Sequence, residues 1–182
     1  MGKFKGNSVL LLTACVNPKG MAFTELQNAD IRYSQYIEAI KYYVNETNFP
    51  IVVVENTNTV LYSGFQREIH MGRMEFLLFD GNRFDLSLGK GYGEGEILRF
   101  AFAHSKLLEK YEFVIKITGR HKVLIINSII SVSQFFSGRS CETIVCDILP
   151  RWKVAVSDFF IASHPFFVDF LNNSSLKIQY TA

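Results

Sequence analysis

The chain contains six short runs that are apolar at nearly every position and that end in polar or turn-forming residues. Runs of this length without a polar face predict β-strands that are buried on both sides of a sheet. They lie at residues 8–15, 51–56, 74–81, 111–120, 143–148 and 153–162.

The segments between these runs carry apolar residues three or four positions apart, which is the spacing of one helix face. In the first of them, Asn28 or Asp30 can cap a helix whose apolar face includes Tyr36 and Ile40. Residues 57–73 show only an irregular or short helical pattern. The predicted helices span residues 30–44, 97–110, 121–136 and 164–173.

Strands and helices therefore alternate along the chain. This order predicts one compact α/β domain over residues 1–182, with a mostly parallel open sheet and helices on both faces. A length of 182 residues fits a single domain, and a hydrophobic content of 48% is enough to build a core.

Charge and cysteine content narrow the classes of function. The net charge is only +2, and no stretch approaches the roughly 20 apolar residues of a membrane helix. We therefore expect no nucleic-acid partner, no polybasic membrane anchor and a soluble, cytoplasmic protein. Cys15, Cys141 and Cys146 lack the spacing of a zinc site, so we expect buried free thiols in a reducing compartment.

Parallel sheets bind ligands at the carboxyl ends of their strands. The polar residues that follow the apolar runs are therefore the candidate site. They are Thr13 and Asn17 after the first strand, Glu55 and Asn56 after the second, and residues 116–120 after the fourth.

The fourth strand ends in K-I-T-G-R, where Lys116 and Thr118 share one face by the two-residue period of a strand. Gly119 frees the backbone to turn, and Arg120 follows it. Two cations, a hydroxyl and exposed amides can bind a diphosphate. The alternative is an ordinary solvated strand end.

The glycine run at residues 89–95 precedes a predicted helix, so we expect a loop that lets a phosphate approach the backbone near Lys90, Gly91 and Glu94. A flexible helix entry is the alternative. The run matches neither the P-loop nor the dinucleotide fingerprint. We therefore predict no organic cofactor, and a divalent metal remains open. Arg32 lies in the first turn of its helix, where a cation is unfavourable, which indicates a role other than helix stability.

Two carboxylates are candidates for the chemistry. Glu55 can accept hydrogen bonds from a nucleobase or ribose. Asp158, in S-D-F-F between a strand and the last helix, can act as a general base, although a lone aspartate is more often a cap or turn residue. His104 lies on a helix stripe, where we expect a residue at the edge of the core. His121 follows Arg120 and could touch a substrate, but we do not include it in the predicted site.

The order of these motifs resembles the nucleotide-sugar glycosyltransferases of the GT-A fold. G-K-G-Y-G-E and K-I-T-G-R resemble, more narrowly, small bacterial transferases of surface-polysaccharide biosynthesis (O-antigen, capsule), some of which use galactofuranose donors. The resemblance covers roughly residues 8–172.

In that family an acid or amide after the second strand holds the nucleoside, a place that Glu55 and Asn56 occupy here. The family's glycine-rich segment and helix correspond to the stretch around Gly91 and Glu94. Its next strand ends in an Asp-x-Asp-type motif that binds a metal on the diphosphate. Residues 116–120 occupy that place without a carboxylate pair.

The resemblance, with this departure, implies that Lys116 and Arg120 neutralise the diphosphate where relatives use a metal, helped by Arg32 and Lys90. The other possibility is a metal held by acids such as Asp80 or Asp85.

The resemblance also implies an inverting hexosyltransferase with a UDP-sugar donor and a glycan or lipid-linked glycan acceptor. Asp158 would take the acceptor proton, and the protein could associate peripherally with membrane-bound assembly enzymes at the inner membrane face. The alternative is a non-catalytic nucleotide-sugar-binding or assembly module partnered with an active transferase. A methyltransferase or reductase is more distant, because the first strand ends in N-P-K-G without a glycine loop.

Overall fold

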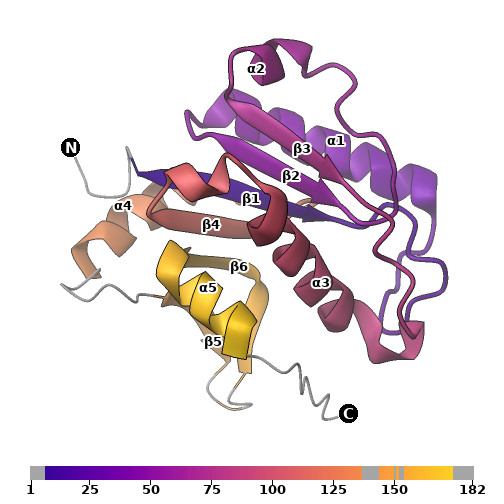
Figure 1. Cartoon of the computed structure of the whole chain (residues 1–182). Helices are drawn as coiled ribbons and strands as arrows, with labels where there is room; N and C mark the ends of the chain where they lie inside the picture. Colours follow the sequence, from indigo (N-terminus) through magenta and orange to yellow (C-terminus); the bar gives the residue numbers. More distant parts are fainter. Residues whose placement is uncertain (1–6, 137–143, 150, 152–153, 174–182) are drawn as a thin grey trace.

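The computed structural model describes residues 7–136, 144–149, 151 and 154–173. The strands form one six-stranded sheet in the order β3-β2-β1-β4-β6-β5 (Figure 1). β1 to β4 are parallel, β6 runs against β4, and β5 runs against β6. The predicted α/β class with a mostly parallel open sheet is confirmed. The strands are β1 Ser8–Ala14, β2 Ile51–Glu55, β3 Met74–Leu78, β4 Phe113–Thr118, β5 Ile144–Leu149 and β6 Val154–Ser163.

Helices cover both faces of this sheet, which gives three layers. The side chains of α1 and α4 pack with one hydrophobic cluster, and those of α3 and α5 pack with the other. Figure 1 shows α3 and α5 beside β4 and β6. The helices are α1 Ala29–Glu46, α2 Gln66–His70, α3 Gly89–His104, α4 Ile126–Phe136 and α5 His164–Asn173, with 3₁₀ turns η1 Leu86–Leu88 and η2 Leu108–Lys110.

The central strand β1 lies between the two hydrophobic clusters. Leu10 and Leu12 pack on the α1 side, while Val9 and Leu11 pack on the α3 side, and all four are fully buried. This alternation follows from the two-residue period of a strand. It explains why the run is apolar at successive positions and ends in polar residues only where the strand leaves the core.

Local signals set the start of α1 as the sequence predicts. The Oδ1 atom of Asn28 accepts a hydrogen bond from the backbone N–H of Ile31 at 3.0 Å, so Asn28 is the N-cap. Asp30 lies inside the first turn, where its negative charge favours the helix dipole.

The predicted glycine loop is wrong, because residues 89–95 form the first turns of α3. A Cβ atom at Gly93 would come 2.9 Å from the Phe84 ring and 3.4 Å from the Met21 side chain. Gly89 has a left-handed φ of 78°. The close packing leaves no room for a larger side chain at Gly93. Glycine is accommodated there although it destabilises a helix by about 1 kcal/mol per residue relative to alanine.

Other boundaries also differ from the sequence prediction. The helix of residues 97–110 ends at His104, and the helix of residues 121–136 begins at Ile126. Asp158 lies within β6, which agrees with the predicted strand of residues 153–162, and it does not lie between that strand and the last helix. Among the described residues, no helix is long and apolar enough to cross a membrane. Cys15 and Cys146 are free and half-buried, and Cys141 lies outside the described residues.

Candidate functional site

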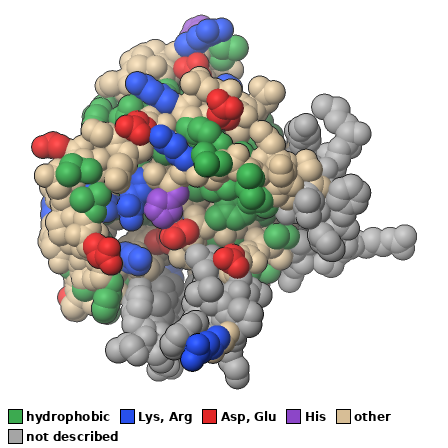
Figure 2. Space-filling view, turned by 180° about the vertical axis from the view of Figure 1, so that it is seen from behind, with side chains coloured by type: hydrophobic (Ala, Val, Ile, Leu, Met, Phe, Trp, Pro, Cys, Tyr) green, Lys and Arg blue, Asp and Glu red, His purple; other side chains and the backbone are tan. Residues whose placement is uncertain are grey.

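A cavity of about 410 Å³ opens at the carboxyl ends of β1, β2 and β4, the edge that the sequence predicts. Its walls come from these strand ends, from the loop between β1 and α1, and from α1, α3 and β6. Figure 2 shows basic, acidic and histidine side chains gathered beside a hollow in the surface. Of the predicted site residues, the cavity is lined by Thr13, Arg32, Asn56, Lys90, Gly91, Glu94, Thr118, Arg120 and Asp158.

Asn56 supplies a buried polar surface at one end of the cavity. Its backbone N–H donates to the Ala14 carbonyl at 3.1 Å, and its side chain is fully buried. Within the part of the chain that the structure describes, neither the Oδ1 nor the Nδ2 atom of Asn56 has a hydrogen-bond partner. A buried amide without partners costs free energy, so this side chain is ready to bind a polar ligand group.

Glu55, the neighbour of Asn56, does not line the cavity. Its buried carboxylate accepts hydrogen bonds from the backbone N–H groups of Val16, Thr57 and Thr59 at 3.0, 2.9 and 2.6 Å. These bonds join the loops that follow β1 and β2. Because the carboxylate is already satisfied by the protein, its predicted nucleoside contact does not fit this structure.

Lys116 lies in the core, not among the cavity cations. It shares a face with Thr118, as the strand period predicts, with 3.4 Å between the Nζ and Oγ1 atoms. The Lys116 side chain is fully buried, and its ammonium contacts the Glu94 carboxylate and the Ser157 carbonyl. The same Glu94 oxygen accepts from the Thr13 hydroxyl at 3.1 Å. The prediction that Lys116 meets a diphosphate is therefore corrected.

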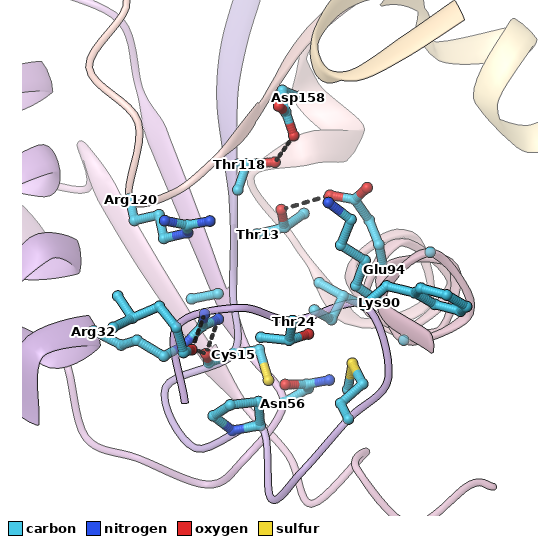
Figure 3. A pocket seen from close by; sticks show the side chains of 18 of the residues that line it. Thr13, Cys15, Thr24, Arg32, Asn56, Lys90, Glu94, Thr118, Arg120 and Asp158 are labelled. Carbon is cyan, nitrogen blue, oxygen red and sulfur yellow. Dashed lines mark hydrogen bonds between the residues drawn. The ribbon is translucent and has the colours of Figure 1, made fainter. Parts of the chain in front are cut away.

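Two cations of the cavity have no ion-pair partner among the described residues. Arg120 follows β4 and is half-buried, and Lys90 is exposed in the first turn of α3. Figure 3 shows Arg120 on the β4 side of the cavity and Lys90 on the side of α3. An anion in the cavity would therefore meet positive charge from both sides.

Arg32 is a third cation, and its N–H groups are used within the protein. Its Nε and Nη2 atoms donate to the Cys15 carbonyl at 2.8 and 2.6 Å, and Nη1 donates to the Leu26 carbonyl at 3.2 Å. These bonds hold the loop after β1 against α1. Arg32 therefore has a role other than helix stability, as its unfavourable position in the helix indicates. That role is to hold the backbone of the loop after β1, and its predicted contact with a diphosphate is not needed to explain it.

Asp158 lies on β6 at the end of β4, with its side chain 54% exposed. The Thr118 hydroxyl donates to its Oδ1 atom at 3.3 Å, and Nδ1 of His121 lies 3.9 Å from its Oδ2 atom. Burial lowers the pKa of His121 below its usual value, Asp158 opposes this, and Arg120 adds to it.

Gly119 allows β1 and β4 to meet closely below the cavity. Its N–H donates to the Thr13 carbonyl at 2.8 Å, and an added Cβ atom would lie 2.8 Å from the same oxygen. Gly119 does not line the cavity, so the structure gives it no contact with a ligand. Its role is to let the backbones of β1 and β4 approach each other closely. Gly119 thereby positions its two chain neighbours, Thr118 and Arg120, which both line the cavity.

The acids considered for a metal lie outside the cavity. Asp80 pairs with Arg83 at 2.5 Å, and Asp85 accepts from the Ser87 N–H at 3.0 Å as the cap of η1. Within the described part of the chain, no group of three or more His, Cys, Asp or Glu side chains is placed to hold a metal.

Of the loop between β1 and α1, the sequence pattern indicated only Asn17 as a site residue, and Asn17 does not line the cavity. The loop instead contributes the cavity residues Cys15, Met21, Phe23 and Thr24. The left-handed φ of 60° at Phe23 is unusual for an aromatic residue, but no composition signal reveals it. The position of His121 beside Asp158 was missed as well.

Comparison with known proteins identifies the fold. No protein-family model matches the chain, and no curated protein sequence matches it. A cytidylyltransferase from Leptospira borgpetersenii serovar Hardjo-bovis matches 93% of this chain and 66% of its own, with a TM-score of 0.51 and 12% identity. The chain thus spans about two thirds of that protein's length. A 4-diphosphocytidyl-2C-methyl-D-erythritolsynthase from Anaerococcus prevotii matches 98% of this chain and 80% of its own, with a TM-score of 0.41 and 10% identity. At such identity the first match shows a shared fold: a six-stranded, mostly parallel sheet flanked by helices.

Proposed function

We propose that this chain is a transferase that binds a nucleoside diphosphate sugar in the cavity and transfers the sugar to an acceptor hydroxyl. The order of the cavity side chains supports this. In Figure 3, Asn56 and Asp158 lie at opposite ends, and Arg120 and Lys90 lie between them. A base or ribose, a diphosphate and an acceptor would meet an amide, two cations and a carboxylate in turn.

The chemistry follows from these groups. Arg120 and Lys90 would bind the diphosphate, together with backbone N–H groups of the first turn of α3, which has no side-chain cap. As the bond from sugar to phosphate breaks, the leaving diphosphate gains negative charge, and these cations stabilise it. A proton acceptor at the Asp158 end would activate the acceptor hydroxyl for attack opposite the leaving group, which inverts the anomeric centre.

The observation that carries the proposal is the fully buried amide of Asn56, which faces the same cavity as Arg120. Among the described residues, this amide has no hydrogen-bond partner and Arg120 has no ion-pair partner. An amide offers one acceptor and two donors, which suits the edge of a nucleobase or the hydroxyls of a ribose. The G-K-G-Y-G-E and K-I-T-G-R motifs favour a UDP-hexose, with UDP-galactofuranose the first donor to test, and a glycan or lipid-linked glycan as acceptor.

A second candidate is nucleotidyl transfer, which the shared fold with a cytidylyltransferase favours. The two reactions leave different products. Glycosyl transfer releases a nucleoside diphosphate, whereas nucleotidyl transfer from a nucleoside triphosphate releases pyrophosphate. A third possibility is a module that binds nucleotide sugars without turnover and assists an active transferase.

The test is calorimetry followed by product analysis. UDP, CDP, UDP-galactofuranose, UDP-galactose and UDP-glucose are titrated into the wild-type chain and the Asn56→Ala variant, with and without a chelator. Bound donors are then incubated with glycan acceptors, and nucleoside diphosphate and pyrophosphate are quantified. UDP release that depends on acceptor supports glycosyl transfer. In a parallel incubation of CTP with a sugar phosphate, pyrophosphate release supports the second candidate, and binding without turnover supports the module. Equal affinity of wild type and Asn56→Ala for every nucleotide would contradict the proposed site.

A further inference from the structure

We propose that the acceptor proton is taken by His121, and that Asp158 is the carboxylate that positions it. This rests on the proposed function and assigns the proton transfer within that site. His121 follows the cavity residue Arg120, and Nδ1 of its ring lies 3.9 Å from Oδ2 of Asp158, which also lines the cavity. The His121 side chain is 39% exposed, and although His121 does not itself line the cavity, its chain neighbour Arg120 and its partner Asp158 both do.

Neighbouring residues hold His121 and Asp158 in place. The backbone N–H of His121 donates to the Thr118 carbonyl at 2.9 Å, and its carbonyl accepts from the Tyr43 hydroxyl at 2.7 Å. The Thr118 hydroxyl donates to Oδ1 of Asp158, which leaves Oδ2 for the imidazole. The contacts with Thr118 and Tyr43 hold the backbone of His121, and the Thr118 hydroxyl holds the Asp158 carboxylate, so both members of the pair are anchored to regular elements of the fold.

The charges around the ring favour its neutral form. Partial burial lowers the pKa of His121, and the nearby Arg120, Lys116 and Lys90 lower it further against the opposing effect of Asp158. A neutral imidazole accepts a proton near pH 7, the range in which histidine serves best as a general base. With Nδ1 facing the carboxylate, Nε2 is the nitrogen left to receive the proton. The imidazolium that forms is then stabilised by Asp158, as in other histidine–carboxylate pairs.

The step balances without a further reactant. The acceptor oxygen forms a bond to the anomeric carbon while the bond from that carbon to the phosphate oxygen breaks. The leaving nucleoside diphosphate keeps the electron pair and its negative charge, beside Arg120 and Lys90. The acceptor proton moves to Nε2 of His121, and it leaves to solvent after the products dissociate.

The experiment compares His121→Gln, Asp158→Asn and the matched control His104→Gln, all in the full chain with a UDP-sugar and its acceptor. His104 is exposed on α3, and its ring packs on Phe100 away from the cavity, so its substitution is expected to leave turnover unchanged. For His121→Gln we expect kcat to fall about 100-fold or more, the usual contribution of a general base, with the donor dissociation constant unchanged.

The pH profile separates a proton acceptor from a structural role. Wild-type kcat/KM should fall on the acid side with a midpoint below 6.5, because the pKa of His121 is lowered from that value. In Asp158→Asn the midpoint should move to lower pH, since the charge that raises the His121 pKa is lost. In His121→Gln this acid limb should vanish. Near-normal kcat in His121→Gln, or an unchanged acid limb, would overturn the assignment and leave the transferase proposal intact. Absence of any donor binding by wild type would overturn both.

Discussion

The ammonium of Lys116, buried at the end of β4, contacts the carboxylate of Glu94 on α3. The pair joins a central strand of the sheet to the helix that carries Lys90. Glu94 also accepts from Thr13 of β1, so one carboxylate links three elements that line the cavity. A cation in this position adds little net charge to the cavity, because Glu94 neutralises it. The charge that an anionic ligand meets comes from Lys90 and Arg120.

Removing one member of this pair should destabilise the fold. In Lys116→Met, the Glu94 carboxylate keeps only its Thr13 hydrogen bond in a site that is 20% exposed. We expect the free energy of unfolding to fall by about 3 kcal/mol, the usual cost of leaving a largely buried charge unpaired. Urea denaturation followed by circular dichroism measures it. The control Lys122→Met, which breaks the exposed pair with Glu38, should change stability by less than about 1 kcal/mol.

The double variant Lys116→Met/Glu94→Gln checks the cause. Because it removes both charges, it should recover part of the stability lost in Lys116→Met. Strictly additive losses would mean that the two side chains do not interact, contrary to the contact in the structure.

The two unpaired cations should control nucleotide affinity and leave the fold unchanged. Charge-assisted hydrogen bonds contribute about 1.5–3 kcal/mol each, so Arg120→Ala and Lys90→Ala should each weaken UDP binding by about 10-fold or more. Calorimetry at two salt concentrations measures this, and the loss should be smaller at high salt. Lys122→Ala serves as the control, since that lysine pairs with Glu38 and does not line the cavity. Unchanged UDP affinity in both cavity variants would contradict a phosphate site between them.

The fold was predictable because local patterns decide it. Leu10 and Leu11 pack on opposite faces of the sheet, so an uninterrupted apolar run is what such a strand requires. Asn28 caps α1 through a contact three residues away, which is also visible in the sequence. The direction of the parallel strands alone also predicts which edge of the sheet carries the cavity, because ligands bind at the carboxyl ends of such strands.

The roles within the site were harder to predict, because partners distant in sequence decide them. K-I-T-G-R indicates two cations, but only the fold shows that Glu94 of α3 pairs with Lys116 and leaves Arg120 unpaired. Similarly, E-N indicates two polar groups after β2. Glu55 is used by the N–H groups of two loops, and Asn56 alone faces the cavity. Glycines that suggest a loop can equally allow close packing at a helix start.

Stability should fall between pH 9 and about 11 because of Cys15. Burial raises the pKa of this thiol from 9.0 to about 11, with Arg32 opposing the shift. In this window the unfolded chain releases a proton that the folded protein keeps, so rising pH favours unfolding by about 2 kcal/mol. Urea unfolding across this range measures the loss. In Cys15→Ala the decline should be smaller by that amount, and identical slopes in wild type and variant would contradict the raised pKa of the Cys15 thiol.

Gly119→Ala tests whether the close approach of β1 and β4 shapes the cavity. The added Cβ atom would lie 2.8 Å from the Thr13 carbonyl oxygen, and this backbone atom can move only if the strand ends separate. We expect a loss of about 1–3 kcal/mol in the free energy of unfolding, the usual effect of overpacking, and weaker UDP binding because Thr118 and Arg120 are displaced.

Gly64→Ala is the matched control for this substitution. Gly64 has a left-handed φ of 94° and open space around it, so alanine there should cost about 1 kcal/mol through backbone strain alone. It does not line the cavity, and UDP affinity should stay at the wild-type value. Denaturation and calorimetry on both variants separate the two effects. If Gly119→Ala loses stability but binds UDP as wild type does, the junction of β1 and β4 supports the fold and does not position the ligand-binding residues.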